Sequence, residues 1–282
     1  MAKRVLAIND IICNMRIAVC IKQVPDTTSV RIDPVTNTLM REGVASVTNP
    51  FDLQALEQAL VLKDALAAEV TVISMGPPQA ADVLRDALAR GADRAFLVSS
   101  RAFGGADTLA TAYTLAQTLR MLYGNDTLPE LMLFGQQAVD GDTAQVGPGV
   151  SACLNVPLVT YVRRLEIRPD GSGFRARTSF DDGECMIDGK FPVVMTVGKD
   201  AAQARFASLF GTMSARAVEI PVLDEAAIHA EASRLGLKGS PTKVMSIASP
   251  PVKTRGKVLP WDGDTRELIC AIRAAVARGE RS

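Results

Sequence analysis

A polar loop between an apolar strand-like run and a helix-like run carries most of the side chains that could bind a ligand. It spans residues 135–148 and reads Gly-Gln-Gln-Ala-Val-Asp-Gly-Asp-Thr-Ala-Gln-Val-Gly-Pro. Main-chain N–H groups of such a loop, together with the N-terminus of the following helix, can hold a phosphate or pyrophosphate. Asp140 and Asp142 could accept hydrogen bonds from ribose hydroxyls, and Gln137 or Gln145 could bond to a base or a sugar.

A simpler alternative is that Asp142 or Thr143 only caps the N-terminus of the helix, as these residue types often do. Standard nucleotide and metal motifs do not fit the loop. It lacks the Gly-Lys-Ser/Thr ending of a P-loop, and residues 147–152 match G-x-G-x-x-A only with a proline inside. A calcium loop would need oxygen ligands where Ala144 and Ser151 stand, so calcium is disfavoured.

The overall composition argues against several other functions. The 282 residues contain 31 Lys and Arg and 31 Asp and Glu, so the formal net charge is zero. Binding to nucleic acid or to an anionic membrane would need an excess of positive charge. Aromatic residues are only 5% of the chain, too few for base-stacking platforms. No apolar run approaches the roughly 18 residues of a membrane-spanning helix. We expect neither nucleic-acid binding nor membrane insertion.

The chain also has few histidine and cysteine side chains that could carry acid–base or thiolate chemistry. The single histidine, His229, lies in a polar stretch and is expected to be a solvated surface residue. The cysteines are an odd number without a C-x-x-C pair, which disfavours zinc sites, iron–sulfur clusters and a disulfide scaffold. They are Cys13, Cys20, Cys153, Cys185 and Cys270. We therefore predict no catalytic side chain and no metal site.

Alternating strands and helices position the polar loop. Strands are expected at residues 16–22, 70–75, 95–99 and 131–134, and helices at residues 50–67, 80–90, 107–122 and 143–154. Near-continuous apolar strands separated by helices indicate an α/β, Rossmann-like, doubly wound sheet that is mainly parallel and covered on both faces. In such a sheet, ligands bind beyond the carboxyl ends of the strands.

After Pro157 the pattern changes. Strand-like runs at residues 159–167, 175–180 and 191–197, separated by turn residues, predict antiparallel strands at the sheet edge. Beyond Ile220 the chain is rich in proline, which indicates a C-terminal arm rather than a second core. The expected divisions are an N-terminal extension (1–14), an α/β nucleotide-binding domain (15–222) and a C-terminal arm (223–282). The extension resembles a signal peptide only weakly, so a cytoplasmic location is expected.

Five short motifs follow one another along the chain. They are Val19-Cys-Ile-Lys-Gln-Val-Pro-Asp26, Asn49-Pro-Phe-Asp52, Met75-Gly-Pro77, Gly91-Ala-Asp93 and the loop at residues 135–148. Each alone is weak, but in this order they resemble the β subunit of electron transfer flavoprotein, over about residues 15–222. The resemblance implies a heterodimer with an α subunit that makes most of the contacts to an FAD.

The resemblance also implies a nucleotide site in this chain, which holds AMP in the common form of the family and a second FAD in electron-bifurcating forms. Carried over by position, that site comprises Cys20, Asn49, Pro50, Phe51, Asp52, Met75, Gly135, Gln136, Gln137, Ala138, Val139, Asp140, Gly141, Asp142, Thr143, Ala144, Gln145 and Val146. The stretch at residues 140–148 and the long C-terminal arm resemble the bifurcating or anaerobic subgroup more closely, so FAD is favoured over AMP.

The implied function is electron carriage between flavin dehydrogenases and a quinone reductase, ferredoxin or flavodoxin. NADH would be oxidised only in a bifurcating form, and the flavin would supply the redox chemistry. One alternative is an ATP-binding or adenylylating α/β domain without a redox role, although ATP chemistry usually wants a basic residue and the loop has none. Another is a scaffold subunit whose site is vestigial.

Partner contacts follow from the same resemblance. The family's Asn-Glu-Pro-Arg-Tyr segment appears here as Ala201-Ala-Gln-Ala-Arg-Phe206, which keeps only Arg205 and an aromatic residue. The leucine that docks into partner dehydrogenases matches Leu209. Arg205 and Leu209 are thus the predicted partner-docking residues, and the arm at 223–282 is expected to contact the α subunit.

Overall fold

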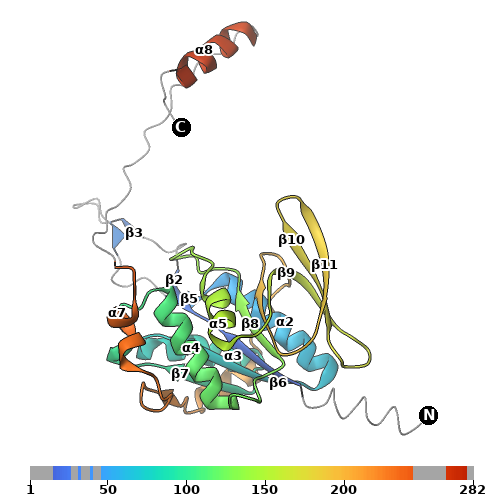
Figure 1. Ribbon diagram of the computed structural model, residues 1–282, viewed down its shortest axis with the longest axis vertical. Coiled ribbons are helices and arrows are strands. Elements are labelled where there is room, and N and C mark those ends of the chain that lie inside the picture. The colour runs from blue at the N-terminus through green and yellow to red at the C-terminus, as the bar shows by residue number, and fades with distance from the viewer. Residues whose placement is uncertain (1–14, 27–30, 33–38, 41–45, 244–264, 278–282) are drawn as a thin grey trace. The chain divides into compact units, whose positions relative to one another are not determined.

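The computed structural model describes residues 15–26, 31–32, 39–40, 46–243 and 265–277 (Figure 1). The expected extension at residues 1–14 lies outside them. The chain divides into two compact units, Met1–Met245 and Ser246–Ser282. This division falls later than the expected one after Val222, because the chain from residue 222 to 243 packs onto the first unit. Ile228 and Leu235, for example, are buried in its core.

A nine-stranded sheet forms the centre of the first unit, in the order β11-β10-β9-β12-β8-β1-β6-β7-β13. Its strands are β1 (Arg16–Cys20), β6 (Glu69–Met75), β7 (Arg94–Val98), β8 (Leu131–Gly135), β9 (Leu158–Ile167), β10 (Phe174–Phe180), β11 (Gly183–Gly189), β12 (Val193–Val197) and β13 (Val222–Leu223). In this sheet, the neighbouring strands along the row β9-β12-β8-β1-β6-β7-β13 are all parallel. The pairs β9–β10 and β10–β11 are antiparallel. A mainly parallel sheet with antiparallel edge strands is confirmed.

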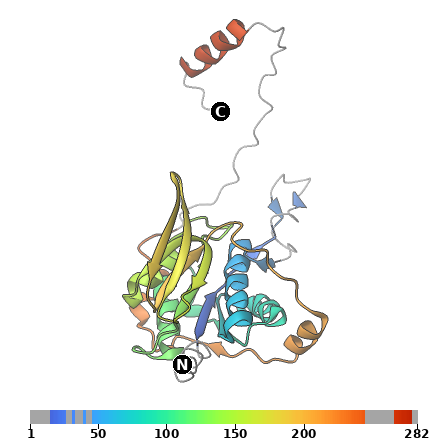
Figure 2. The ribbon, with the colours of Figure 1, turned by 90° about the vertical axis from the view of Figure 1, so that its right-hand side faces the viewer.

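Helices cover both faces of this sheet (Figure 2). One face packs against α2 (Pro50–Leu66) and α3 (Ala81–Arg90), the other against α4 (Thr108–Tyr123) and α5 (Val146–Leu154). In the central strand, Ile17 and Val19 point to the first core, and Ala18 and Cys20 point to the second. Because β1 is buried on both faces, neither of its faces needs polar side chains, which explains its nearly continuous apolar sequence.

The other described elements are short. They are β2 (Gln23–Pro25), β3 (Arg31–Ile32), β4 (Leu39–Met40), β5 (Ser46–Thr48), η2 (Pro78–Ala80), η3 (Arg101–Phe103), α6 (Leu209–Arg216), η4 (Ala232–Arg234) and α7 (Gly236–Gly239). The second unit contains α8 (Thr265–Ala277), on which Leu268, Ile269, Ile272 and Val276 are exposed. Among the described residues, no helix is long and apolar enough to span a membrane.

The prediction for the later strands was partly wrong. The run ending at Val197 was expected at the antiparallel edge, but β12 lies inside the sheet, parallel to β8 and β9, and all five of its residues are buried. The strand β11 was not predicted, because most of its residues are exposed and it lacks apolar alternation. Which strands pair is decided by long-range contacts that a local pattern does not report.

The strand order reverses direction beside β1. From β1 the chain proceeds through β6 and β7 on one side, and then returns to β8 on the other side of β1. The helix after β1, α2, covers one face of the sheet, and the helix after β8, α5, covers the other. The carboxyl ends of β1 and β8 therefore border the point where the winding reverses, which is where open α/β sheets bind ligands.

Candidate nucleotide-binding site

The residue before α2 fixes the loop that follows β8. Helix α2 starts at Pro50, where the missing N–H of proline is harmless. Asn49 occupies the N-cap position, yet its side chain makes no capping hydrogen bond. Instead, Asn49 Nδ2 donates to the carbonyl oxygen of Gln137 at 2.8 Å, and Asn49 Oδ1 accepts from the N–H of Val139 at 3.3 Å. Asn49 thus shapes the predicted site from inside the fold.

Asp52, in the first turn of α2, joins the ends of β1 and β8. Its buried carboxylate accepts from the N–H of Lys22 at 2.7 Å and from the N–H of Gly135 at 3.1 Å. Burial raises the pKa of Asp52 to about 7, although these hydrogen bonds favour the charged form. A Cβ on Gly135 would lie 2.3 Å from Asp52 Oδ1 and 2.7 Å from the carbonyl carbon of Phe51. Only glycine fits there.

The helix after the loop begins later than predicted. Its first residue is Val146 rather than Thr143, because Asp142 and Ala144 both have φ of 54°. Residues in this left-handed region do not continue a right-handed helix. The N-cap is Gln145, whose side chain makes no capping bond, while the Asp142 carboxylate accepts from Gln137 Nε2. The alternative that Asp142 or Thr143 caps the helix is therefore wrong.

The start of α5 presents unpaired main-chain donors. The N–H groups of residues 143–147 donate to no acceptor among the described residues. Such groups at a helix N-terminus, together with the positive end of the helix dipole, form a site for an anion. The loop therefore has the donors that a phosphate or pyrophosphate group would need.

Two residues outside the predicted site, Lys22 and Thr108, bond to side chains of the loop. Lys22 Nζ lies 2.7 Å from both carboxylate oxygens of Asp140, and Thr108 Oγ1 donates to Gln145 Oε1 at 2.9 Å. Lys22 lies two residues after the end of β1, and Thr108 is the first residue of α4. Their partners are 118 and 37 residues away, and no local signal pairs them.

Cys20 and Met75 lie at the same edge of the sheet as the loop. Cys20 ends β1 and is buried, and Met75 ends β6 and packs against the same core. Burial raises the pKa of the Cys20 thiol, which makes it a packing group rather than a nucleophile. In α2, Phe51 is half-buried and Pro50 is exposed.

The predicted docking residues lie elsewhere. Arg205 precedes α6 and pairs with Glu57 and Asp64 of α2. Leu209 is the first residue of α6 and is 80% exposed. The predicted residues therefore form two groups, one at the carboxyl ends of the strands and one beside α2 at the start of α6.

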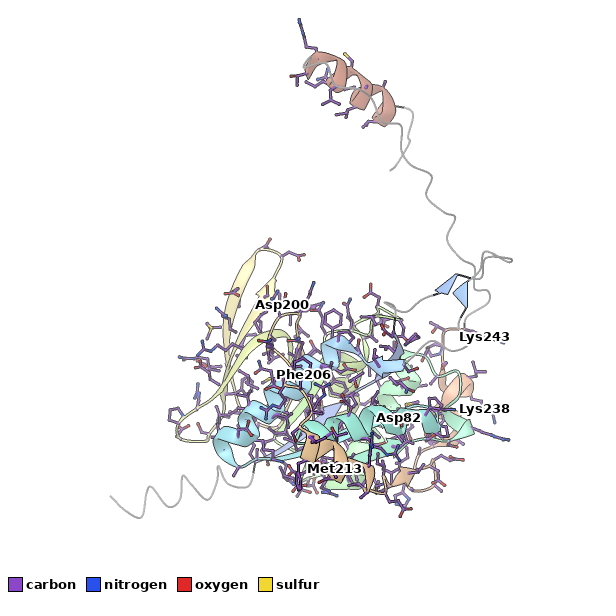
Figure 3. The ribbon with its side chains drawn as sticks, turned by 180° about the vertical axis from the view of Figure 1, so that it is seen from behind. Asp82, Asp200, Phe206, Met213, Lys238 and Lys243 are labelled. Carbon is purple, nitrogen blue, oxygen red and sulfur yellow. The ribbon has the colours of Figure 1, made fainter. Side chains whose placement is uncertain are left out.

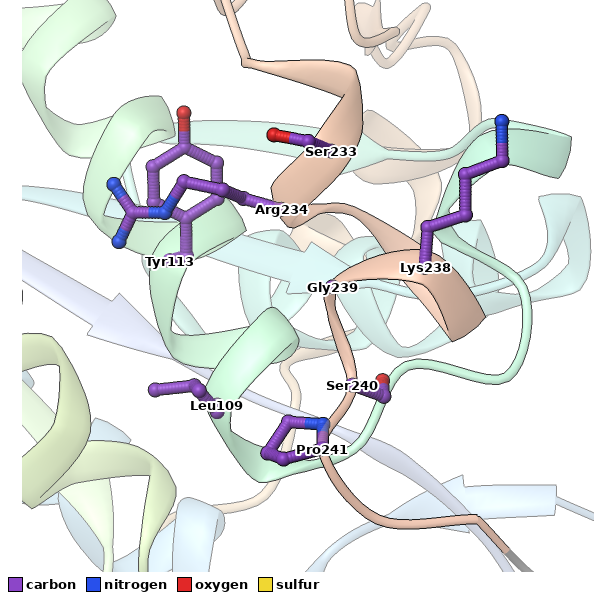
Figure 4. Close-up of a pocket in the computed structure, with 8 residues that line it drawn as sticks. All are labelled: Leu109, Tyr113, Ser233, Arg234, Lys238, Gly239, Ser240 and Pro241. Carbon is purple, nitrogen blue, oxygen red and sulfur yellow. The ribbon is translucent and has the colours of Figure 1, made fainter.

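A cavity of about 340 Å³ lies between α4 and the segment that contains α7 (Figure 4). Its lining includes Tyr113 and Arg234, whose guanidinium carbon is 3.8 Å from the ring centroid. No residue of the predicted nucleotide site lines this cavity, so it is not the site that the strand ends build. His229 is exposed, as predicted. In the described part of the chain, no group of three or more His, Cys, Asp or Glu could hold a metal ion.

Comparisons with known proteins show which family the chain is similar to. The profile of the electron transfer flavoprotein domain matches residues 36–228. The chain is 47% identical over 258 residues to "Electron transfer flavoprotein subunit beta" of Megasphaera elsdenii, covering 90% of this chain and 95% of that protein. It is 46% identical over 246 residues to "Caffeyl-CoA reductase-Etf complex subunit CarD" of Acetobacterium woodii, covering 87% and 92%. It is 41% identical over 264 residues to "Protein FixA" of Azotobacter vinelandii, covering 92% and 94%.

Proposed function

The chain belongs to the electron transfer flavoprotein family, as a β subunit with an electron-transfer role. On this basis, we propose that it binds FAD in the loop between β8 and α5. The supporting observation is the row of N–H groups at residues 143–147, which donate to no acceptor in the described part of the chain and lie beside the point where the winding of the sheet reverses. These groups would hold the pyrophosphate. When bound, the flavin supplies the redox chemistry.

The chain's own residues keep the loop open and fixed. Asn49 and Asp52 occupy buried positions beneath it, so their hydrogen bonds set its main-chain path. Asp140 and Gln145 are tied to Lys22 and Thr108 at its rim. A loop that is ordered before binding loses less conformational freedom when the nucleotide arrives.

We propose FAD rather than AMP because residues 140–148 and the long C-terminal segment resemble the bifurcating subgroup. NADH oxidation at this flavin, followed by transfer to two acceptors, would then be the reaction of the heterodimer. The ATP-dependent alternative is not favoured. The loop contains no basic residue, and Lys22, which reaches it, is paired with Asp140.

The partners follow from the two remaining surfaces. An α subunit would bind the C-terminal segment, where α8 exposes Leu268, Ile269, Ile272 and Val276. A flavin dehydrogenase would dock at α6, which begins with the exposed Leu209 and follows Arg205. Electrons would pass from the heterodimer to a quinone reductase, ferredoxin or flavodoxin.

Flavin stoichiometry tests the proposal. The chain is co-expressed with its α subunit, and FAD and AMP released by denaturation are counted by chromatography against the protein concentration. We expect two FAD and no AMP in each heterodimer. One FAD and one AMP would overturn the assignment of FAD to this loop. A colourless chain that binds ATP with magnesium, and no α subunit, would overturn the electron-carrier function itself.

A further inference from the structure

The segment before α6 is bound along α2 by three side chains of that helix. Gln54 Oε1 accepts from the N–H of Ala202 at 2.8 Å, and Gln58 Nε2 donates to the carbonyl oxygen of Ala201 at 2.9 Å. Glu57 Oε2 accepts from the N–H of Arg205 at 2.9 Å. All three bonds go to main-chain atoms. They therefore hold the main chain of the segment against α2, and the bond at Arg205 depends on Glu57.

The Arg205 side chain adds a second set of contacts to α2. Its Nε lies 3.1 and 3.0 Å from the two Glu57 oxygens, and one terminal nitrogen lies 3.0 Å from Glu57 Oε1 and 2.8 Å from Asp64 Oδ2. The Glu57 side chain is only 9% exposed. Arg90 of α3 also donates to the Arg205 carbonyl oxygen. The Arg205 guanidinium thus forms ion pairs with two carboxylates of its own chain, those of Glu57 and Asp64.

Immediately beyond this bound segment, the chain exposes large apolar side chains. Phe206 is 91% exposed, and Leu209, Phe210 and Met213 are also exposed. Figure 3 labels Phe206 and Met213. Helix α6 itself lies close against α3, since a Cβ on Gly211 would be 2.2 Å from the carbonyl oxygen of Ala89. A cluster of exposed apolar residues on rigid supports is typical of a surface for a protein partner. We call Phe206, Leu209, Phe210 and Met213 the docking surface.

We propose that Glu57 and Arg205 are positioning residues for this docking surface, and that Arg205 acts through Glu57 rather than by touching the partner. This inference rests on the proposed docking of a flavin dehydrogenase at α6. Without the Glu57–Arg205 pair, the segment would keep only its main-chain bonds to Gln54 and Gln58, and the part next to the docking surface would have to become ordered at each encounter. That cost weakens association, whereas electron transfer within the formed complex is unchanged.

Steady-state kinetics with the whole flavin-loaded heterodimer tests this inference. The heterodimer is the electron acceptor of a flavin dehydrogenase of the same organism, which is reduced by its own substrate. For Glu57→Gln and for Arg205→Gln we expect KM for the heterodimer to rise about 10-fold with kcat unchanged. The double variant should show a smaller rise than the product of the two single rises, because both changes remove the shared Glu57–Arg205 side-chain pair. Glu69→Gln, which removes an exposed pair with Arg94, is the matched control.

Flavin content and CD spectrum are measured for every variant, since a variant that merely fails to fold would lose both. Leu209→Ala distinguishes docking at α6 from the positioning role of Glu57 and Arg205. If Leu209→Ala raises KM and Glu57→Gln does not, the positioning role is wrong although docking at α6 stands. A rise for Arg205→Gln but not for Glu57→Gln would mean that Arg205 contacts the partner directly. If none of the variants changes KM, docking at α6 is itself refuted.

Discussion

At the scale of single residues, Asp52 combines burial with two main-chain hydrogen bonds at the junction of β1 and β8. Both donors, the N–H groups of Lys22 and Gly135, need an acceptor. An asparagine in this position would present its amide nitrogen to one of them. One buried donor would then lack a partner, which costs about 1–3 kcal/mol.

The raised pKa of Asp52 makes this cost depend on pH. From its ordinary value of 3.8 up to about 7, the folded protein keeps a proton on Asp52 that the unfolded chain has released. The contribution of Asp52 to the free energy of unfolding therefore falls as pH rises through this window. We expect the destabilisation caused by Asp52→Asn to be larger at pH 5 than at pH 8, as measured by urea unfolding. An equal difference at both pH values would contradict the shifted pKa.

Gly135 is the second residue on which the loop depends. In Gly135→Ala the added Cβ would collide with Asp52 Oδ1 and with the main chain of α2. We expect a loss of about 1–3 kcal/mol in the free energy of unfolding, with loss of the bound nucleotide from the purified heterodimer. Gly198→Ala is the control, because Gly198 lies outside the predicted site and its Cβ would make only ordinary contacts, at 3.6 Å or more. Nucleotide retention in Gly135→Ala equal to that of the control would argue against the site.

At the scale of elements, successive turns of α2 bind two separate segments of the chain. The N-cap residue Asn49 and Asp52 of the first turn bond to the loop after β8, and Gln54, Glu57 and Gln58 bond to the segment before α6. The opposite, apolar side of the helix, with Leu56 and Leu60, is buried in the core. One well-packed helix therefore sets the positions of both regions.

The packing of α6 on α3 gives a prediction at this scale. In Gly211→Ala the new Cβ would stand 2.2 Å from the carbonyl oxygen of Ala89, so α6 must move away from α3. We expect faster amide hydrogen exchange across α6 and weaker association with the dehydrogenase, but unchanged nucleotide content. Gly198→Ala is the control, since its Cβ would make only ordinary contacts at 3.6 Å. Unchanged exchange in α6 would show that this close approach is not needed.

At the scale of the whole molecule, the chain separates a folded α/β unit from its C-terminal segment. The described core residues end with Leu235, and the next part of the chain is bound to α4 by Asp107, which accepts from the N–H and hydroxyl of Thr242 at 3.0 and 2.8 Å. The first unit thus has its own core and its own closing contacts.

Removing residues 246–282 tests this division. We expect the truncated chain to keep its CD spectrum and to unfold cooperatively at nearly the same Tm, because the described core lies before residue 246. Association with the α subunit should weaken, since α8 and its exposed apolar residues are gone. The full-length chain is the reference in both measurements. A truncated chain that unfolds at a much lower temperature would place part of the core in the C-terminal segment.

The sequence by itself determined the parallel α/β class, the order of most elements and the polar loop after β8. These features are local: apolar strands buried on both faces, helices with amphipathic spacing, and a turn-rich loop are written in neighbouring residues. The start of α2 at Pro50 is equally local, because it depends on the proline itself.

Tertiary structure alone decided the position of β12 inside the sheet, the existence of β11, and the late start of α5. It also decided that Asn49 and Asp52 bond to the loop, that Lys22 meets Asp140, and that Arg205 bonds to Glu57. Each of these contacts joins residues that are more than 80 positions apart. Their pairing depends on how strands are ordered and how helices pack, and a local pattern carries no record of either.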